Sequence, residues 1–123
     1  MTASNSFLIG VVGPCGAGKS TLIEGLDERG YATRHIAQEH SYVRDMWQRI
    51  TNPDVLIFLQ VSFTVSLERR PMNWNESEYN EQQHRLSHAL EHADLVLDTD
   101  QLSIQEVLEQ VINFLEKTKN SKT

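Results

Sequence analysis

A short glycine-rich stretch near the amino terminus has the residue types and the spacing that bind phosphate. Residues 13–21 fit the pattern G-x-x-x-x-G-K-S and follow an apolar run. A loop that wraps a phosphate chain turns successive backbone N–H groups inward, so glycines stand where φ is positive or where a Cβ would collide with the ligand. The helix expected after the loop directs its unpaired N–H groups at the same anion. The predicted phosphate-binding residues are Gly13, Pro14, Cys15, Gly16, Ala17, Gly18, Lys19, Ser20 and Thr21.

Within this loop the side chains suggest separate tasks on a nucleoside triphosphate. Lys19 is expected to reach the β- and γ-phosphates, the Ser20 hydroxyl to ligate Mg²⁺, and Thr21 to lie near the α-phosphate. Cys15 is interpreted as a small spacer residue, with a reactive thiol as the alternative. The sequence contains no Asn-Lys-x-Asp run, the usual guanine-reading motif, so ATP is expected rather than GTP.

An acidic residue should complete the site, because phosphoryl transfer asks the protein mainly for positioning and charge stabilisation. Glu39 follows an expected strand beside the one that leads into the phosphate loop. It is our candidate for holding a metal-bound water or the acceptor, and the alternative is an ordinary solvated loop acid. Asp98 also follows an apolar strand, but that strand is expected to be remote from the one before the loop, so either a turn role or a contact near the nucleotide base is predicted for it.

Hydrophobic patterning predicts the elements that position these residues. The continuous apolar runs 7–12 and 55–59 are typical of strands buried on both faces of a parallel sheet, whereas 31–37 and 95–97 read as outer strands. Helices are expected over 19–29, 41–51, 65–70 and 75–92 and after Ser103. Asn75 with Glu78 resembles a capping box for the 75–92 helix, and Ser103 with Glu106 is expected to cap the last one. We therefore predict an α/β fold with a mostly parallel four-stranded sheet in the spatial order 31–37, 7–12, 55–59, 95–97. Helices cover both faces, and ligands bind at the carboxyl edge.

Two finer expectations concern the helices. The 41–51 helix is expected to bury apolar side chains at 42, 43, 46, 47 and 50, and the 75–92 helix to bury those at 79, 83, 86, 90 and 93. His84, His88 and His92 recur at four-residue spacing, which invites a metal site, but helix geometry predicts that they face solvent. Trp47 and Trp74 are predicted to pack in the core or lid, with Trp74 the better candidate for a ligand contact.

Together these segments resemble the P-loop nucleoside and nucleotide kinase superfamily of NTPases. Beyond the loop, residues 52–61 look like its strand before the lid, 67–70 like the start of that lid, and 93–100 like its last strand. The resemblance implies a three-layer P-loop NTPase fold and a lid-like segment at about 69–80. It also implies that Arg69 or Arg70 neutralises charge on the transferred phosphoryl group. The alternative is that this pair of cations stabilises a helix C-terminus. The strand before the lid ends in Gln60, where relatives commonly carry Asp.

The functional expectation is an ATP-binding kinase that moves the γ-phosphoryl group of Mg-ATP to an unidentified small acceptor. Its catalytic residues would be Lys19, Glu39, Arg69 and Arg70, with Mg²⁺ on Ser20. Two alternatives stay open, a nucleotide-binding regulatory module with little or no turnover and an NTP hydrolase.

Size and composition bound the class of protein. The 123 residues are expected to form one domain, 1–123, and 11 basic against 17 acidic residues give a net charge of −6. That charge argues against a nucleic acid or an anionic membrane as the main partner. One cysteine, no signal peptide and no long apolar run predict a cytoplasmic protein. The edges of a four-stranded sheet leave room for a homodimer.

Overall fold

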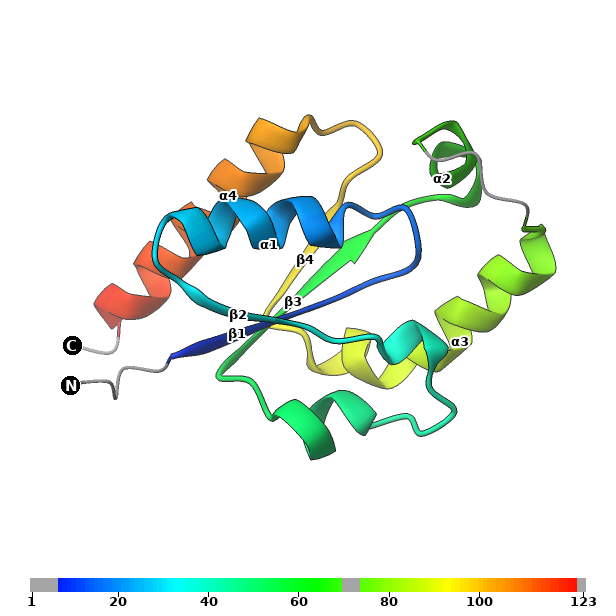
Figure 1. Ribbon diagram of the computed structural model, residues 1–123, viewed down its shortest axis with the longest axis horizontal. Coiled ribbons are helices and arrows are strands. Elements are labelled where there is room, and N and C mark those ends of the chain that lie inside the picture. Colours follow the sequence, from blue (N-terminus) through cyan, green and yellow to red (C-terminus); the bar gives the residue numbers. More distant parts are fainter. Residues whose placement is uncertain (1–6, 70–73, 122–123) are drawn as a thin grey trace.

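The computed structural model describes residues 7–69 and 74–121 and has an α/β architecture (Figure 1). Two short helical turns stand among the regular elements, a 3-10 helix at Gln38–His40 and a π-helix at Trp47–Thr51. The strands and α-helices are, in chain order, β1 Leu8–Val12, α1 Lys19–Glu28, β2 Ala32–His35, β3 Val55–Gln60, α2 Phe63–Arg69, α3 Glu76–His92, β4 Leu95–Asp98 and α4 Ile104–Ser121.

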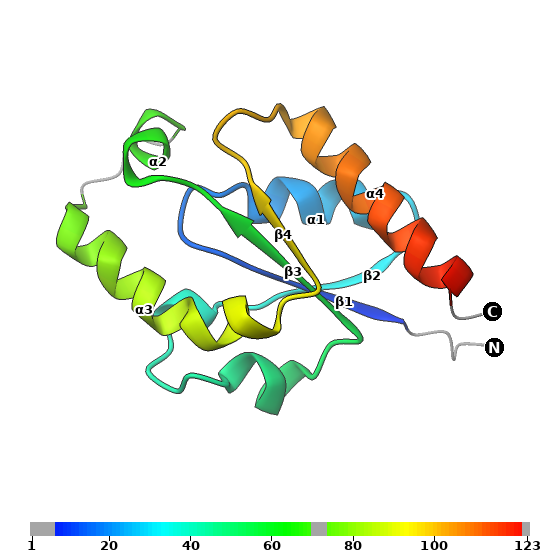
Figure 2. The same cartoon turned by 180° about the vertical axis from the view of Figure 1, so that it is seen from behind.

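The four strands form one parallel sheet in the order β2-β1-β3-β4, which confirms the predicted order. Because the strands are parallel, their carboxyl ends meet at one edge of the sheet. The connection from β1 to α1 and the short helix α2 lie at this edge, while β1 begins and α4 ends at the opposite edge (Figures 1 and 2).

Alternate residues of the central strands build two separate cores. Ile9 and Ile57 point to the face covered by α1 and α4, and Leu56 and Phe58 point to the face covered by α3 and Trp47. All four side chains are buried, as expected for strands with apolar residues on both sides. Helices thus cover both faces, an arrangement compatible with a three-layer fold (Figure 2).

Local capping signals act where the sequence predicted them. The Asn75 side chain accepts a hydrogen bond from the Glu78 backbone N–H at 2.9 Å, and the Glu78 carboxylate accepts one from the Asn75 N–H at 2.9 Å. Ser103 and Glu106 make the same reciprocal pair before α4. These capping boxes fix where the two longest helices begin.

The helix predicted over 41–51 is wrong for most of its length. Tyr42 is 84% exposed, and within this segment the helical structure is essentially a π-helical turn. The buried Gln38 side chain explains the difference, since it donates to the Val43 carbonyl at 2.8 Å and accepts from the Trp47 backbone N–H at 2.8 Å. Both backbone groups would otherwise serve a helix, so a side chain from five and nine residues earlier in the chain competes with the helical hydrogen bonds.

The predicted buried stripe of α3 is confirmed at Leu86 but is wrong at Leu90. Gln82, Leu86 and Ala89 are buried, whereas Leu90 is exposed. His88 accordingly turns toward the protein, where its Nδ1 accepts a hydrogen bond from Trp47 Nε1 at 3.2 Å, so the prediction of a fully solvated histidine row fails at this residue. The buried face of α3 differs from the predicted one because buried Trp47 and Cys15 both contact this helix.

Within residues 7–69 and 74–121, no helix combines the length and the apolar character needed to cross a membrane. Arg70 and part of the lid-like segment at 69–80 lie outside these residues. Trp74 packs against Phe63 and Tyr79 with ring centroids 6.2 and 5.9 Å away, and it is not among the residues that line the cavity described below.

Candidate functional site

The connection between β1 and α1 is a tight loop in which glycine is required. We call residues 13–21 the phosphate loop. Gly13 has φ +154°, and a Cβ there would stand 2.2 Å from the Leu59 carbonyl oxygen. Gly16 has φ +88°, and its Cβ would stand 3.0 Å from that of Ser66 in α2. The loop therefore fits tightly against β3 and α2, and α1 begins at Lys19 directly after it.

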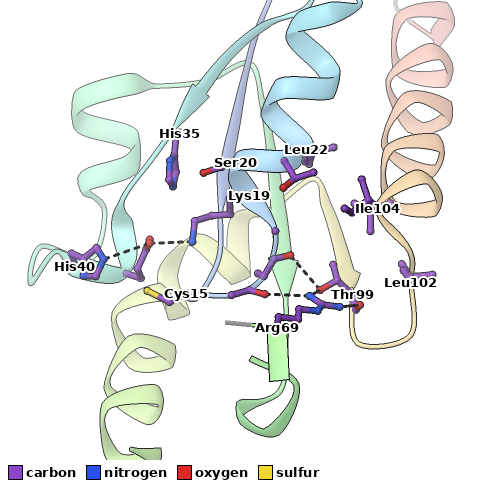
Figure 3. Close-up of a pocket in the computed structure, with 16 residues that line it drawn as sticks. Cys15, Lys19, Ser20, Leu22, His35, His40, Arg69, Thr99, Leu102 and Ile104 are labelled. Atoms are coloured by element: carbon purple, nitrogen blue, oxygen red, sulfur yellow. Dashed lines mark hydrogen bonds and ion pairs between the residues drawn. The ribbon is translucent and has the colours of Figure 1, made fainter. Parts of the chain in front are cut away.

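A cavity of about 690 Å³ opens at the carboxyl edge of the sheet, beside this loop (Figure 3). Gly13 and Pro14 do not line it, but the other predicted loop residues do. The lining residues are Cys15, Gly16, Ala17, Gly18, Lys19, Ser20, Thr21, Leu22, His35, Glu39, His40, Arg69, Thr99, Leu102, Ile104 and Val107. Glu39 and Arg69, predicted from distant parts of the sequence, therefore share one cavity with the loop.

Lys19 and Glu39 form a buried ion pair at the floor of this cavity. Lys19 Nζ lies 3.0 Å from Glu39 Oε2, and the two side chains are only 6% and 4% exposed. The ammonium also donates to the carbonyl oxygens of Gly13 at 2.5 Å and Pro14 at 3.1 Å. Glu39 Oε1 is buried and has no hydrogen-bond partner among the described residues. A buried oxygen without a donor is costly, so this atom is suited to receive a ligand group.

The 3-10 helix after β2 holds Glu39 in place. Its neighbour Gln38 is fully buried and bonds the 41–47 segment, as described above, and also donates to the Arg85 carbonyl at 3.2 Å. Arg85 Nη1 in turn donates to the Glu39 carbonyl at 3.3 Å. Glu39 is therefore positioned by contacts of its turn with Arg85 of α3.

Arg69, at the end of α2, joins the loop to the segment after β4. Its guanidinium donates to the Gly16 carbonyl at 3.2 Å, to Thr99 Oγ1 at 2.9 Å and to the Thr99 carbonyl. The Thr99 hydroxyl lies 2.9 Å from the Gln60 carbonyl at the end of β3. The side chain thus lines the cavity while protein oxygens occupy its N–H groups (Figure 3).

Gln82 is a site residue that the sequence prediction missed. Its Oε1 accepts a hydrogen bond from the Cys15 backbone N–H at 3.0 Å, and its Nε2 donates to Cys15 Sγ at 3.3 Å. A polar residue four positions before the buried Leu86 shares its helix face. This four-residue spacing could have indicated that Gln82 is buried, but only if the buried face of α3 had been predicted correctly.

His35 lines the cavity near Lys19 and Glu39. Partial burial lowers the pKa of this imidazole, and the nearby Lys19 charge lowers it further, while Glu39 acts in the opposite direction. Ser20 and Thr21 are exposed on the same side of the cavity. An anion would find there the Lys19 ammonium, two hydroxyl groups and the start of α1.

Asp98 and Gln60, two other residues considered in the sequence, do not line the cavity. Asp98 Oδ1 accepts a hydrogen bond from the Asp100 N–H at 3.0 Å, in keeping with the turn role expected for it. Gln60, at the end of β3, exchanges amide hydrogen bonds with Gln83 at 2.8 and 3.2 Å. Glu39 is therefore the carboxylate that reaches the loop lysine within the described part of the chain.

No protein-family model matches the chain, and no curated protein matches it. The geometry of the cavity and the chemistry of its lining residues therefore carry the functional argument.

Proposed function

We propose that this chain has a P-loop NTPase fold and binds Mg-ATP in the cavity, as a small kinase that transfers the γ-phosphoryl group to a small acceptor. The observation that carries the proposal is the phosphate loop itself. Its positive-φ glycines lie between a buried parallel strand and a helix whose first residue is a lysine.

Lys19 would change partners when a nucleotide binds. In the free protein its ammonium is held by two loop carbonyls and Glu39. The β- and γ-phosphates would offer it more strongly charged acceptors, and charge-assisted hydrogen bonds are about twice as strong as neutral ones. In the nucleotide-free protein the ion pair therefore holds the lysine side chain at the loop, where the phosphates would bind.

The residues present fit a magnesium ion. Ser20 lines the cavity and carries a hydroxyl oxygen. Glu39 Oε1, which has no partner among the described residues, is a carboxylate oxygen, a ligand type that suits Mg²⁺ and the water bound to it. Mg²⁺ would neutralise charge on the β- and γ-phosphates. Ser20 would hold the ion, and Glu39 would hold a water on it or orient the acceptor hydroxyl.

A second candidate function is a nucleotide-binding regulatory module with little or no turnover. Arg69 favours it, because the guanidinium is engaged by Gly16 and Thr99 rather than free to follow a transferred phosphoryl group. An arginine held in this way could instead couple nucleotide binding at the loop to the position of the segment after β4.

Binding of a fluorescent ATP analogue with Mg²⁺ tests the shared premise. We expect Lys19→Ala to weaken binding at least about tenfold, since a charge-assisted bond is worth about 1.5 to 3 kcal/mol. Lys117→Ala is the matched control, because it removes one exposed lysine from α4, away from the cavity, and should leave binding unchanged. Equal affinity of wild type and Lys19→Ala would contradict nucleotide binding at this loop.

ADP release then separates the functions. Release stimulated by one of a panel of nucleosides, nucleotides and small hydroxyl metabolites supports the kinase. Steady release without an acceptor indicates a hydrolase, and tight binding without release indicates the regulatory module.

A further inference from the structure

Three metal-binding side chains meet at the cavity end of the phosphate loop. Cys15 Sγ, one Glu39 carboxylate oxygen and one His40 ring nitrogen all lie within 4.8 Å of one another. The thiol comes from the loop, and the other two come from the 3-10 helix after β2. Figure 3 shows Cys15 and His40 toward the same end of the cavity, near Lys19.

We propose that Cys15, Glu39 and His40 bind a thiophilic divalent cation, with Zn²⁺ the best fit. Thiolate, imidazole and carboxylate together are a zinc donor set, whereas Mg²⁺ prefers oxygen ligands alone. This site therefore differs in chemistry from the magnesium position proposed at Ser20. Three protein ligands leave a fourth tetrahedral position open to water or an exogenous ligand.

The geometry needs only a small closure. In a tetrahedral zinc site neighbouring ligand atoms lie about 3.4 to 3.6 Å apart, so a separation at the 4.8 Å limit would have to shorten by about 1.2 to 1.4 Å. His40 Nε2 is already 3.8 Å from Glu39 Oε2. The His40 side chain is 60% exposed and can turn toward the other two ligands without disturbing the core.

Two further observations point to a ligand at this place. Glu39 Oε1 is buried and lacks a partner among the described residues, although its side chain is only 4% exposed. A cation would satisfy this oxygen. Gln82 holds Cys15 at both its backbone N–H and its sulfur, the kind of outer contact that orients a metal ligand.

The charge of Lys19 opposes metal binding at this site. Its ammonium lies 3.0 Å from Glu39 Oε2, so a cation bound to the same carboxylate is repelled by it. Removing this charge should therefore tighten metal binding. The same substitution should weaken nucleotide binding, so Lys19→Met separates the two proposals by the sign of its effect.

Cobalt binding gives a direct test, because Co²⁺ takes zinc sites and its bond to a thiolate has a charge-transfer absorption. Cys15 is the single cysteine of the chain, so this band identifies its sulfur as a ligand. The reduced full-length protein is titrated with Co²⁺ without nucleotide, and Zn²⁺ is then added to displace it. We expect the band in the wild type, its loss in Cys15→Ser and its gain at lower Co²⁺ concentration in Lys19→Met.

Exposed His40 keeps the test falsifiable if Cys15→Ser disturbs the loop. We expect His40→Asn to weaken Zn²⁺ binding at least about tenfold, as loss of metal-site partners does. His84→Asn is the matched control on the exposed face of α3 and should change nothing. Absence of the band in the wild type, or equal Zn²⁺ affinity in the wild type and His40→Asn, would overturn the proposal.

One consequence rests on the proposed function. Because Glu39 serves both sites, Mg-ATP should release bound Co²⁺ and Zn²⁺ should inhibit nucleotide binding. A protein that binds Co²⁺ through Cys15 but does not bind ATP would refute the proposed function and leave the metal site standing.

Discussion

Replacing Lys19 with methionine removes one half of a buried ion pair and leaves the other half in place. Glu39 would keep its position on the 3-10 helix, since Gln38 and Arg85 hold that turn independently of the lysine. The carboxylate would then lose its counter-charge at 3.0 Å, and among the residues that the structure describes only His40, at 3.8 Å, would remain as a partner.

The expected loss of folding stability is large for a single residue that lines a cavity. Removing one partner of a buried pair typically destabilises a protein by about 3 to 5 kcal/mol. We expect the lower limit, about 3 kcal/mol, because the pair lines an open cavity that admits water. At about 4 °C per kcal/mol for a domain of this size, the melting temperature should fall by about 12 °C.

A double-mutant cycle in urea, without nucleotide, measures the effect. The proteins are the wild type, Lys19→Met, Glu39→Gln and the double variant, and unfolding is followed by tryptophan fluorescence. The double variant should be less destabilised than the two single variants added together, because the uncompensated charge is gone. Arg49→Met is the matched control, since Arg49 pairs with Asp45 at 2.9 Å but is 70% exposed and should cost less than about 1 kcal/mol.

Two results would refute this reasoning. One is a loss in Lys19→Met no greater than that in Arg49→Met. The other is a coupling energy near zero, which would mean that solvent in the cavity already screens Lys19 from Glu39.

Three other predictions concern separate parts of the structure. Arg69→Lys should lower the free energy of unfolding by about 1 kcal/mol, because a lysine cannot reproduce the forked hydrogen bonds, and an unchanged melting temperature would contradict this. Asn75→Ala should lower the free energy of unfolding in urea by about 1 kcal/mol, because it removes the cap of α3. Asn80 is exposed in the same helix, so Asn80→Ala should be neutral or slightly stabilising. Equal effects of the two substitutions would argue against the cap. The pKa of His35, followed by NMR, should lie below its ordinary value of 6.5 and rise partway toward it in Lys19→Met, since burial is the larger cause and remains. Because the folded pKa is the lower one, the stability linked to His35 is present above pH 6.5 and is lost as the pH falls, and a pKa at or above 6.5 would contradict the assignment.

The local signals in the sequence were sufficient for the sheet and for the starts of α1, α3 and α4. Apolar runs at 7–12 and 55–59 predicted the central strands, and their order followed from burial on both faces. The reciprocal caps at Asn75 and Ser103 formed as expected, because a capping box satisfies backbone groups within a few residues of itself. The phosphate loop pattern is equally local, and its glycines have the backbone conformation that the pattern implies.

Side-chain contacts that no hydrophobic periodicity reveals decided the rest. The 41–51 segment has helical periodicity, but buried Gln38 takes two of the backbone groups that a helix would need. The face of α3 depends on what packs against it, and Gln82 is buried because it bonds Cys15, a residue 67 positions away. Periodicity identifies a helix, yet it cannot say which polar residue a distant partner will satisfy.

The sequence by itself determined the phosphate loop, because glycine conformation and the start of α1 are properties of neighbouring residues. Only the tertiary structure decided what surrounds that loop. It brings Glu39 to Lys19 across the β1-β2 pairing, and it binds Arg69 to Thr99 instead of leaving its N–H groups free. Charge pairs and hydrogen bonds between distant segments depend on distances that the folded chain alone sets.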